Sequence, residues 1–360
     1  MADDELDGVA RRAAGEALET GSSVGEAPVP PAALPTSRRS RVKVPETAAL
    51  FVVLIVLFVF FSLASPFFFS QQNLLVILQQ VVRIGIVACP ATLLLISGQF
   101  DLSVGSIAGF AGMTLALLAA APGTPGASFA FDLPVEIAAV FAIAAAALVG
   151  LINAVCVTTL RINALITTLG TLAIFRGITK VLSNGQTVNV NGFSGLGLER
   201  VLGIPVPVYL LAIVVVVFFF ILRFTTYGRS MYAIGASPTA ARLAGIRTNR
   251  AIFVGFMLSA LLAGLAGVIL VSQVGAATIN SGEGLELAVI TAVVLGGASL
   301  GGGRGTILGT ILAVLIVGVL RNGLVQIGVQ SFWIEVAGGV LLLTAVGADQ
   351  LRIRLTRSVA

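Results

Sequence analysis

Residues 48–65, AALFVVLIVLFVFFSLAS, decide the fold because they form an uninterrupted apolar run without a single charge. One membrane-spanning helix needs about 20 mostly apolar residues, so this run is long enough to cross a bilayer. Similar runs recur along the chain, separated by Gly, Pro, Asn and charged residues. We therefore predict an all-α, polytopic membrane protein with about ten transmembrane helices. The expected spans are 48–65, 74–97, 103–121, 135–159, 164–181, 207–223, 251–272, 285–299, 305–321 and 332–348.

The composition excludes several classes of protein. Of the 360 residues, 57% are apolar and 10% are charged, against about 25% charged residues in soluble domains. The chain has no histidine, and neither Lys43 nor Lys180 follows a glycine as a phosphate-binding loop requires. Cys89 and Cys156 both lie in apolar runs, which excludes a disulfide framework. We expect no catalytic residue, no metal site and no cofactor, so the chain is not predicted to be an enzyme.

The basic residues predict the orientation, since Lys and Arg near span ends stay on the cytoplasmic side. With the amino terminus inside, 14 of the 21 basic residues fall inside and four fall at outer span ends. An even number of spans keeps both termini cytoplasmic. The high pI of 9.9 is then a topology signal in a lipid-embedded protein, and we expect no nucleic acid partner. The outer four are Arg176, Lys180, Arg200 and Arg321.

Composition also divides the chain into three parts. Residues 1–45 are rich in Ala, Pro, Gly, Ser and acids, and such a segment buries too little apolar surface to offset its ordering entropy. We predict a disordered cytoplasmic tail at 1–45, a transmembrane domain at 46–349 and a basic cytoplasmic tail at 350–360. Within the domain, residues 95–109 and 295–309 share four identities without gaps, which is compatible with an internal repeat or with chance.

The connection between the sixth and seventh spans, residues 228–246, reads GRSMYAIGASPTAARLAGI and contains arginines but no acid. Ser237 is a good N-cap, Pro238 suits the first helical position and Gly245 ends a helix. We therefore predict a helix of about two turns in the cytosol. Its small residues Ala240, Ala241 and Ala244 favour a docking element, although an ordinary polar connector is the alternative.

This connection is similar to the cytoplasmic coupling loop of bacterial ABC importer permeases of the ribose, xylose and arabinose group, which are relatives of the branched-chain amino acid permeases. Residues 101–106 (DLSVGS), 168–177 (TLGTLAIFRG) and 288–309 agree as well. The resemblance implies a second permease copy, most simply as a homodimer, a cytoplasmic ATPase subunit that binds the ATP, and an extracytoplasmic sugar-binding protein. It also implies that the ATPase binds Gly235, Ser237, Pro238, Ala240, Ala241, Arg242 and Gly245.

Two positions depart from the family pattern. Gln99 and Phe100 stand where Gly and Ile often precede the Asp-Leu-Ser motif, which leaves the substrate open. Ser237 replaces the usual Asn, and this exchange retains the capping chemistry.

Polar residues in or near the spans are candidates for a translocation path, because a charge at membrane depth is costly and normally faces protein or water. Asp101 lies in GQFDLSVGS, residues 98–106, and its alternative is a place in a cytosolic turn. Interhelical hydrogen bonding is the alternative for the amides and hydroxyls of the other spans. The candidates are Gln79, Arg83, Gln99, Asp101, Ser103, Asn153, Asn163 and Thr167.

An outer loop at about 183–206 is rich in Asn and Gly. Together with Glu283 and Glu286, its Glu199 and Arg200 are expected either to receive a binding protein or to form a plain solvated surface.

These observations favour a permease that imports a monosaccharide such as ribose or a similar pentose or hexose, driven by the partner ATPase. The alternatives are import of branched-chain amino acids or nucleosides, and a secondary transporter driven by an ion gradient. The last needs buried titratable groups, for which the spans offer only Asp101 and Glu335.

Overall fold

The computed structural model describes residues 46–190 and 192–357 of the chain. The predicted tail at 1–45 and the last three residues of the predicted tail at 350–360 lie outside this part. All described residues belong to one compact unit.

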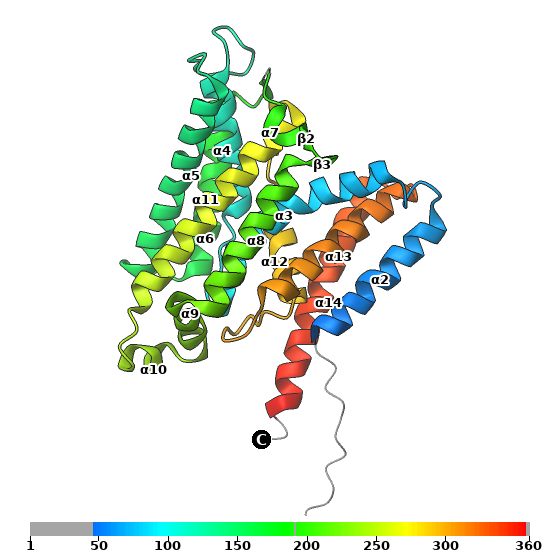
Figure 1. Cartoon of the computed structure of the whole chain (residues 1–360). Coiled ribbons are helices and arrows are strands. Elements are labelled where there is room, and N and C mark those ends of the chain that lie inside the picture. Colours follow the sequence, from blue (N-terminus) through cyan, green and yellow to red (C-terminus); the bar gives the residue numbers. More distant parts are fainter. Residues whose placement is uncertain (1–45, 191, 358–360) are drawn as a thin grey trace, which may run out of the picture. The chain divides into compact units, whose positions relative to one another are not determined.

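Ten apolar helices of the described chain match the ten expected runs (Figure 1). Seven of them are long and apolar enough to cross a membrane, and three are shorter. The chain is thus a mostly helical, polytopic membrane protein. The seven are α2 (Glu46–Ala64), α3 (Gln71–Ile96), α5 (Val135–Thr158), α6 (Ala164–Leu182), α8 (Val206–Phe224), α11 (Thr248–Val274) and α13 (Ile307–Gln326). The shorter three are α4 (Val104–Ala119), α12 (Leu285–Leu295) and the apolar part of α14 (Ser331–Arg357).

Capping residues explain where several of these helices begin. Ser70 accepts a hydrogen bond from the backbone amide of Asn73 at the start of α3, and Thr306 accepts one from Gly309 at the start of α13. The side chain of Asn163 accepts from two amides at the start of α6. Each cap satisfies amides that would otherwise lack an intrahelical partner.

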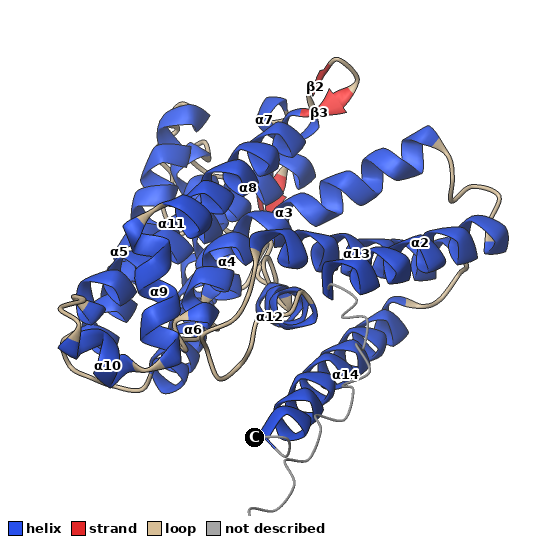
Figure 2. Ribbon diagram, turned by 60° about the horizontal axis from the view of Figure 1, so that its bottom comes forward, coloured by secondary structure: helices blue, strands red, loops and turns tan. Residues whose placement is uncertain are grey.

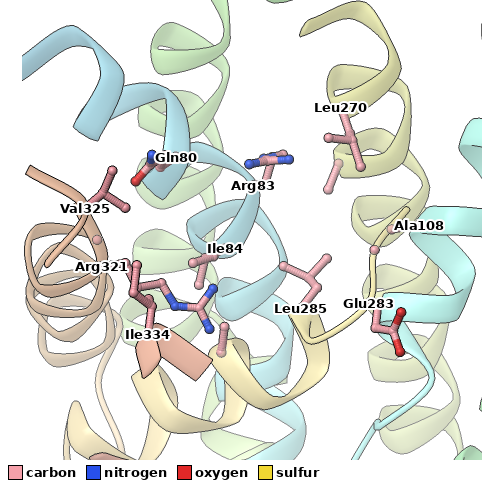
Figure 3. Close-up of a pocket in the computed structure, with 14 residues that line it drawn as sticks. Gln80, Arg83, Ile84, Ala108, Leu270, Glu283, Leu285, Arg321, Val325 and Ile334 are labelled. Atoms are coloured by element: carbon pink, nitrogen blue, oxygen red, sulfur yellow. The ribbon is translucent and has the colours of Figure 1, made fainter. Parts of the chain in front are cut away.

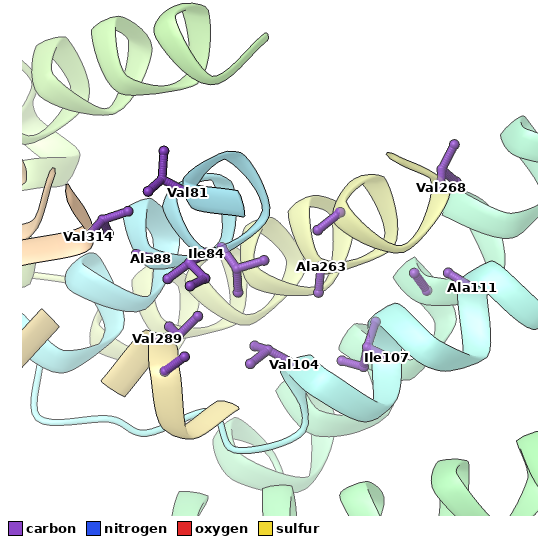
Figure 4. Close-up of a cluster of buried hydrophobic side chains, with 14 of the residues drawn as sticks. Val81, Ile84, Ala88, Val104, Ile107, Ala111, Ala263, Val268, Val289 and Val314 are labelled. Atoms are coloured by element: carbon purple, nitrogen blue, oxygen red, sulfur yellow. The ribbon is translucent and has the colours of Figure 1, made fainter. Parts of the chain in front are cut away.

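Small residues let the central helices approach each other closely. A Cβ atom on Gly267 of α11 would lie 2.1 Å from the carbonyl oxygen of Ala108 in α4, and one on Gly150 of α5 would lie 2.4 Å from Ala260. Such contacts are typical of membrane interiors, where lipid tails are as apolar as the side chains and packing provides the attraction. Around them, α3, α4, α11, α12 and α13 contribute short aliphatic side chains to one buried cluster (Figure 4).

The all-α prediction needs one small correction at the connecting loops. Two pairs of two-residue strands occur among the described residues: β1 (Val188–Asn189) pairs with β4 (Ala276–Ala277), and β2 (Arg200–Val201) pairs with β3 (Ile204–Pro205), both antiparallel. Figure 2 shows β2 and β3 at the edge of the helices, beside the short helix α7 (Gly195–Leu198). Pairing satisfies backbone groups that no helix includes.

The two segments that share the sequence echo form corresponding turns. Residues 97–103 connect α3 to α4, and residues 296–306 connect α12 to α13. The turns contact each other, because the amide of Gly303 donates to the carbonyl of Ile96 at 2.7 Å. The similarity therefore extends from sequence to position in the fold, while gene duplication stays a prediction.

The start of α2, the end of α14 and the short helix α10 (Pro238–Leu243) lie toward the same end of the bundle in Figure 1. Helix α14 continues to Arg357, so the predicted tail at 350–360 begins as helix rather than as a separate segment.

Candidate functional site

The predicted two-turn helix is present and has the predicted caps. Helix α9 (Thr226–Ala236) ends at Ser237, whose hydroxyl then accepts a hydrogen bond from the amide of Ala240 at 3.2 Å to begin α10. Pro238 occupies the first turn, and Gly245 adopts a φ of 81° after the last one. Glycine adopts this left-handed conformation at little cost, which explains why the helix stops there.

Only part of α10 faces outward. Pro238, Ala240, Arg242 and Gly245 are exposed, whereas Ala241 is 3% exposed and packs against the chain's own core. Ala241 therefore holds α10 in place, and the expectation that it contacts a partner needs revision. Leu243 is 86% exposed and was missed in the sequence, although a large apolar residue in a short helix outside the spans is itself a signal of a contact surface.

Helix α9 fastens α10 to both turns of the sequence echo. Gly235 has no room for a side chain, because a Cβ atom there would lie 1.8 Å from the carbonyl oxygen of Ile96 and 2.4 Å from the amide of Gly303. The Tyr232 hydroxyl donates to the carbonyl of Gly305 at 2.7 Å. Gly235, predicted to bind the ATPase, is thus an internal joint. Through α9, α10 is therefore connected to the end of α3 and to the turn that precedes α13.

The Asp101 side chain is 6% exposed and lies in a closed network of hydrogen bonds. One carboxylate oxygen accepts from the amide and the hydroxyl of Ser103, at 3.0 and 2.6 Å. The other accepts from the Ser259 hydroxyl of α11 at 2.6 Å. Asn153 of α5 donates to the Ser103 hydroxyl at 2.8 Å, and Thr171 of α6 donates to Asn153 at 2.8 Å. The network joins the start of α4 to three other helices.

Every donor in this chain of hydrogen bonds leads toward the Asp101 carboxylate, which is the arrangement that an acceptor-only, ionised group requires. Asp101 lies in the turn between α3 and α4. Burial raises the pKa of its carboxyl, while the hydrogen bonds from Ser103 and Ser259 act in the opposite direction. Because these partners occupy both oxygens, the geometry supports an interhelical clamp for Asp101, Ser103 and Asn153 rather than contact with a solute.

Of the other path candidates, Gln99 and Asn163 line one cavity, and neither Gln79 nor Thr167 lines it. Asn163 caps α6, and the Thr167 hydroxyl is buried without a partner among the described residues. Gln99 lines a cavity near the start of α11, whereas Gln79 is half-buried on α3. None of these four residues lines the cavity that Arg83 lines.

Arg83 instead lines a cavity of about 280 Å³ between α3, α13 and the segment before α12 (Figure 3). Gln80 and Arg321 reach the same cavity, and Glu283 lies on its other side. A second cavity of about 490 Å³ shares Glu283 and Arg321 and adds Arg176, Glu286 and Glu335. Sequence reasoning placed Arg321 at an outer span end and did not connect it with Arg83, because the two are 238 positions apart.

An ion pair closes one side of this second cavity. Arg176 of α6 donates to a Glu286 carboxylate oxygen at 3.1 Å, and a Glu283 oxygen lies 4.0 Å from the same guanidinium. Glu286 is 7% exposed, so it is not part of a plain solvated surface, which was one of the two interpretations of the sequence. Its other oxygen lies against Gly105 and, like the Arg321 Nε atom, has no hydrogen-bond partner among the described residues. Unpartnered buried polar atoms are costly, which makes them candidates for ligand contact.

The comparisons with known proteins agree with this architecture. The sequence pattern of the family described as "Branched-chain amino acid transport system / permease component" matches residues 73–345. The chain belongs to this family. Its members are transport permeases, and with the apolar helices this makes the chain a multi-pass protein of the bacterial inner membrane. The resemblance seen in the sequence is confirmed.

Three relatives illustrate the similarity. The chain is 38% identical to the ribose import permease protein of Escherichia coli (strain K12) over 83% of this chain and 92% of the relative. It is 35% identical to the Haemophilus influenzae ribose import permease protein, covering 83% and 91%, and 35% identical to the E. coli L-arabinose transport system permease protein, covering 86% and 92%. No solved structure matches the chain.

Proposed function

We propose that this chain is the transmembrane permease of an ATP-driven importer for a monosaccharide, ribose or a similar pentose or hexose. Its relatives at 35–38% identity are named as ribose and arabinose permeases, and this observation carries the proposal. In this function two copies enclose the path, a cytoplasmic ATPase docks on α10, and an extracytoplasmic binding protein delivers the sugar. Both termini face the cytoplasm and the chain crosses the membrane ten times.

The proposed mechanism runs through the joint at Gly235. ATP binding and hydrolysis in the partner move α10, and α9 passes this motion to the turns that end α3 and α12, because its backbone contacts both. The cavity that Arg83 and Arg321 line lies on the same two hairpins, α3–α4 and α12–α13. Amide, guanidinium and carboxylate groups suit the hydroxyls of a sugar, since they donate and accept hydrogen bonds. We propose Arg83, Gln80 and Arg321 as path residues.

Transport in reconstituted vesicles tests the function. The chain is combined with its ATPase and binding protein, and uptake is measured for a panel of pentoses and hexoses, leucine and a nucleoside. We expect ATP-dependent uptake of one monosaccharide. Uptake of leucine would favour branched-chain amino acid import, as the family description suggests, and uptake driven by an ion gradient without the ATPase would overturn the proposal.

A co-purification experiment tests the docking surface separately. The double substitution Arg242→Glu with Leu243→Glu changes two exposed residues of α10 and leaves the buried Ala241 in place. We expect at least about a tenfold loss of bound ATPase, since the loss of a contact that dominates an interface costs about 2 kcal/mol or more. The matched control is Arg200→Glu in the β2–β3 hairpin, which should bind the ATPase normally. Unchanged binding by the α10 variant would exclude this docking surface.

A further inference from the structure

A third cavity, separate from the two described above, lies at the end of the bundle where α5 ends and where α6 and α11 begin. It has a volume of about 830 Å³, and four arginines line it together with backbone of the turn after α3. No Asp or Glu lines it, and none of the four arginines forms an ion pair with any residue in the described ranges. The four are Arg161, Arg242, Arg247 and Arg250, of which Arg242 also belongs to the docking surface proposed for α10, so the tests below use Arg161 and Arg250.

The walls of this cavity are held in place. The Asn249 amide donates to the carbonyl of Thr158 at 3.0 Å and so ties the start of α11 to the end of α5. Arg161 stands between them with a φ of 58°, in the left-handed region that costs a residue with a side chain roughly 1 kcal/mol or more. A glycine would satisfy this turn better, so the backbone alone does not explain an arginine there.

Exposed apolar side chains line this cavity or lie next to it. Ile162 and Leu165 line the cavity and are 41% and 43% exposed, and the adjacent Leu160 and Ile166 are 62% and 66% exposed. Leu165 and Ile166 lie in the first turn of α6, and Leu160 and Ile162 lie in the connection before it. Exposed aliphatic side chains at the end of a membrane helix contact acyl chains. Cations beside exposed aliphatic residues at helix ends therefore match an amphiphile: an anionic headgroup with its tails along α5 and α6.

We propose that this cavity binds the phosphodiester headgroup of an anionic phospholipid of the inner leaflet. Basic pockets between transmembrane helices on the cytoplasmic side bind such headgroups, and each arginine near the membrane surface strengthens binding about fivefold. Guanidinium groups suit the task because they donate two parallel hydrogen bonds to phosphate oxygens. A solvated acidic protein surface would use the arginines but not the apolar rim. The proposal is independent of the transported solute.

The experiment titrates the purified full-length chain in detergent with cardiolipin, phosphatidylglycerol, phosphatidylcholine or inorganic phosphate, and counts bound lipid by native mass spectrometry. We expect the two anionic lipids to bind more tightly than phosphatidylcholine. Arg161→Gly should weaken their binding about fivefold while leaving the unfolding temperature equal or higher, because it removes the strained φ. Arg250→Gln should weaken binding by a similar factor.

The matched control is Leu202→Gly, which removes the same kind of strain at a φ of 52° in the β2–β3 hairpin and should leave lipid binding unchanged. Equal binding of all phospholipids, or anionic lipid binding that neither arginine substitution weakens, would overturn the proposal. Phosphate that displaces cardiolipin at equal concentration would indicate a free anion as the ligand and would also overturn it. The same arginine variants are also tested in the co-purification experiment. Loss of the bound ATPase together with unchanged lipid binding would overturn the proposal, because the cavity would then be a protein-docking surface.

Discussion

The bundle contains two groups of buried polar side chains, and they differ in whether their polar atoms have hydrogen-bond partners. Around Asp101, each carboxylate oxygen has a donor, and the donors come from Ser103 and Ser259. Glu286 pairs with Arg176, but its second carboxylate oxygen and the Arg321 Nε atom have no partner among the described residues, and both Glu286 and Arg321 line a cavity. A saturated network rigidifies the fold, whereas an unsaturated one retains hydrogen-bonding capacity for a solute. The satisfaction of polar atoms thus separates structural residues from candidate path residues better than polarity in the sequence does.

The largest expected effect is on stability, at the centre of the saturated network. Asp101→Ala removes the common acceptor of three hydrogen bonds, and buried donors left without an acceptor cost free energy. We expect the free energy of unfolding to fall by about 3 kcal/mol, measured by denaturant titration in mixed micelles. The exposed Glu136→Ala in α5 serves as the control and should change it by less than about 0.5 kcal/mol. A stable Asp101→Ala protein that fails to transport would instead assign Asp101 to the path.

The next effect is on transport, in the unsaturated group. Glu286→Gln retains the size of the side chain but abolishes the charge that pairs with Arg176, so we expect uptake to fall about tenfold, equivalent to 1.4 kcal/mol, while the fold stays intact. Uptake in vesicles and the unfolding temperature are measured on the same preparation. Glu283→Gln is the matched control, because Glu283 is more exposed and 4.0 Å from the guanidinium, and it should change uptake less than twofold. Normal uptake by Glu286→Gln would show that the unsaturated group around Glu286 and Arg321 does not serve transport.

A smaller effect is expected at the far end of the saturated network. Thr171→Val keeps the shape of the side chain but removes the hydroxyl that donates to Asn153 at 2.8 Å. Interhelical hydrogen bonds of this kind contribute about 1 kcal/mol in membranes, and we expect that loss in the free energy of unfolding. No loss would mean that the network ends at Asn153.

The smallest effect has the opposite sign. Thr167 lies one turn before Thr171 on α6, and its hydroxyl is buried without a partner in the described part of the chain. Thr167→Val removes this unsatisfied group, so we expect the protein to gain up to about 0.5 kcal/mol in the same titration, with uptake unchanged. A fall in uptake without loss of stability would show that the hydroxyl contacts the solute, as the sequence suggested.

Helices and their caps were predictable because they depend on neighbouring residues. The apolar runs and the Ser237-Pro238 start of α10 follow from local rules, and the structure has both. The two cavities were not predictable, because one joins Arg83 of α3 with Arg321 of α13 and the other joins Arg321 with Arg176 of α6, and only tertiary packing brings these residues together. The inward faces of Gly235 and Ala241 were missed for the same reason, since small residues suit close contact with a partner and with the chain itself equally well.

The backbone crossing at Gly235 has a consequence for how the molecule tolerates change. With no space for even a methyl group between α9 and the two turns, side-chain rotation cannot absorb a displacement there. Such a tightly packed crossing passes a displacement of α9 directly to both turns, and it tolerates few substitutions. Sensitivity to substitution should therefore peak at this crossing, near the ends of the helices, rather than at the middle of the bundle.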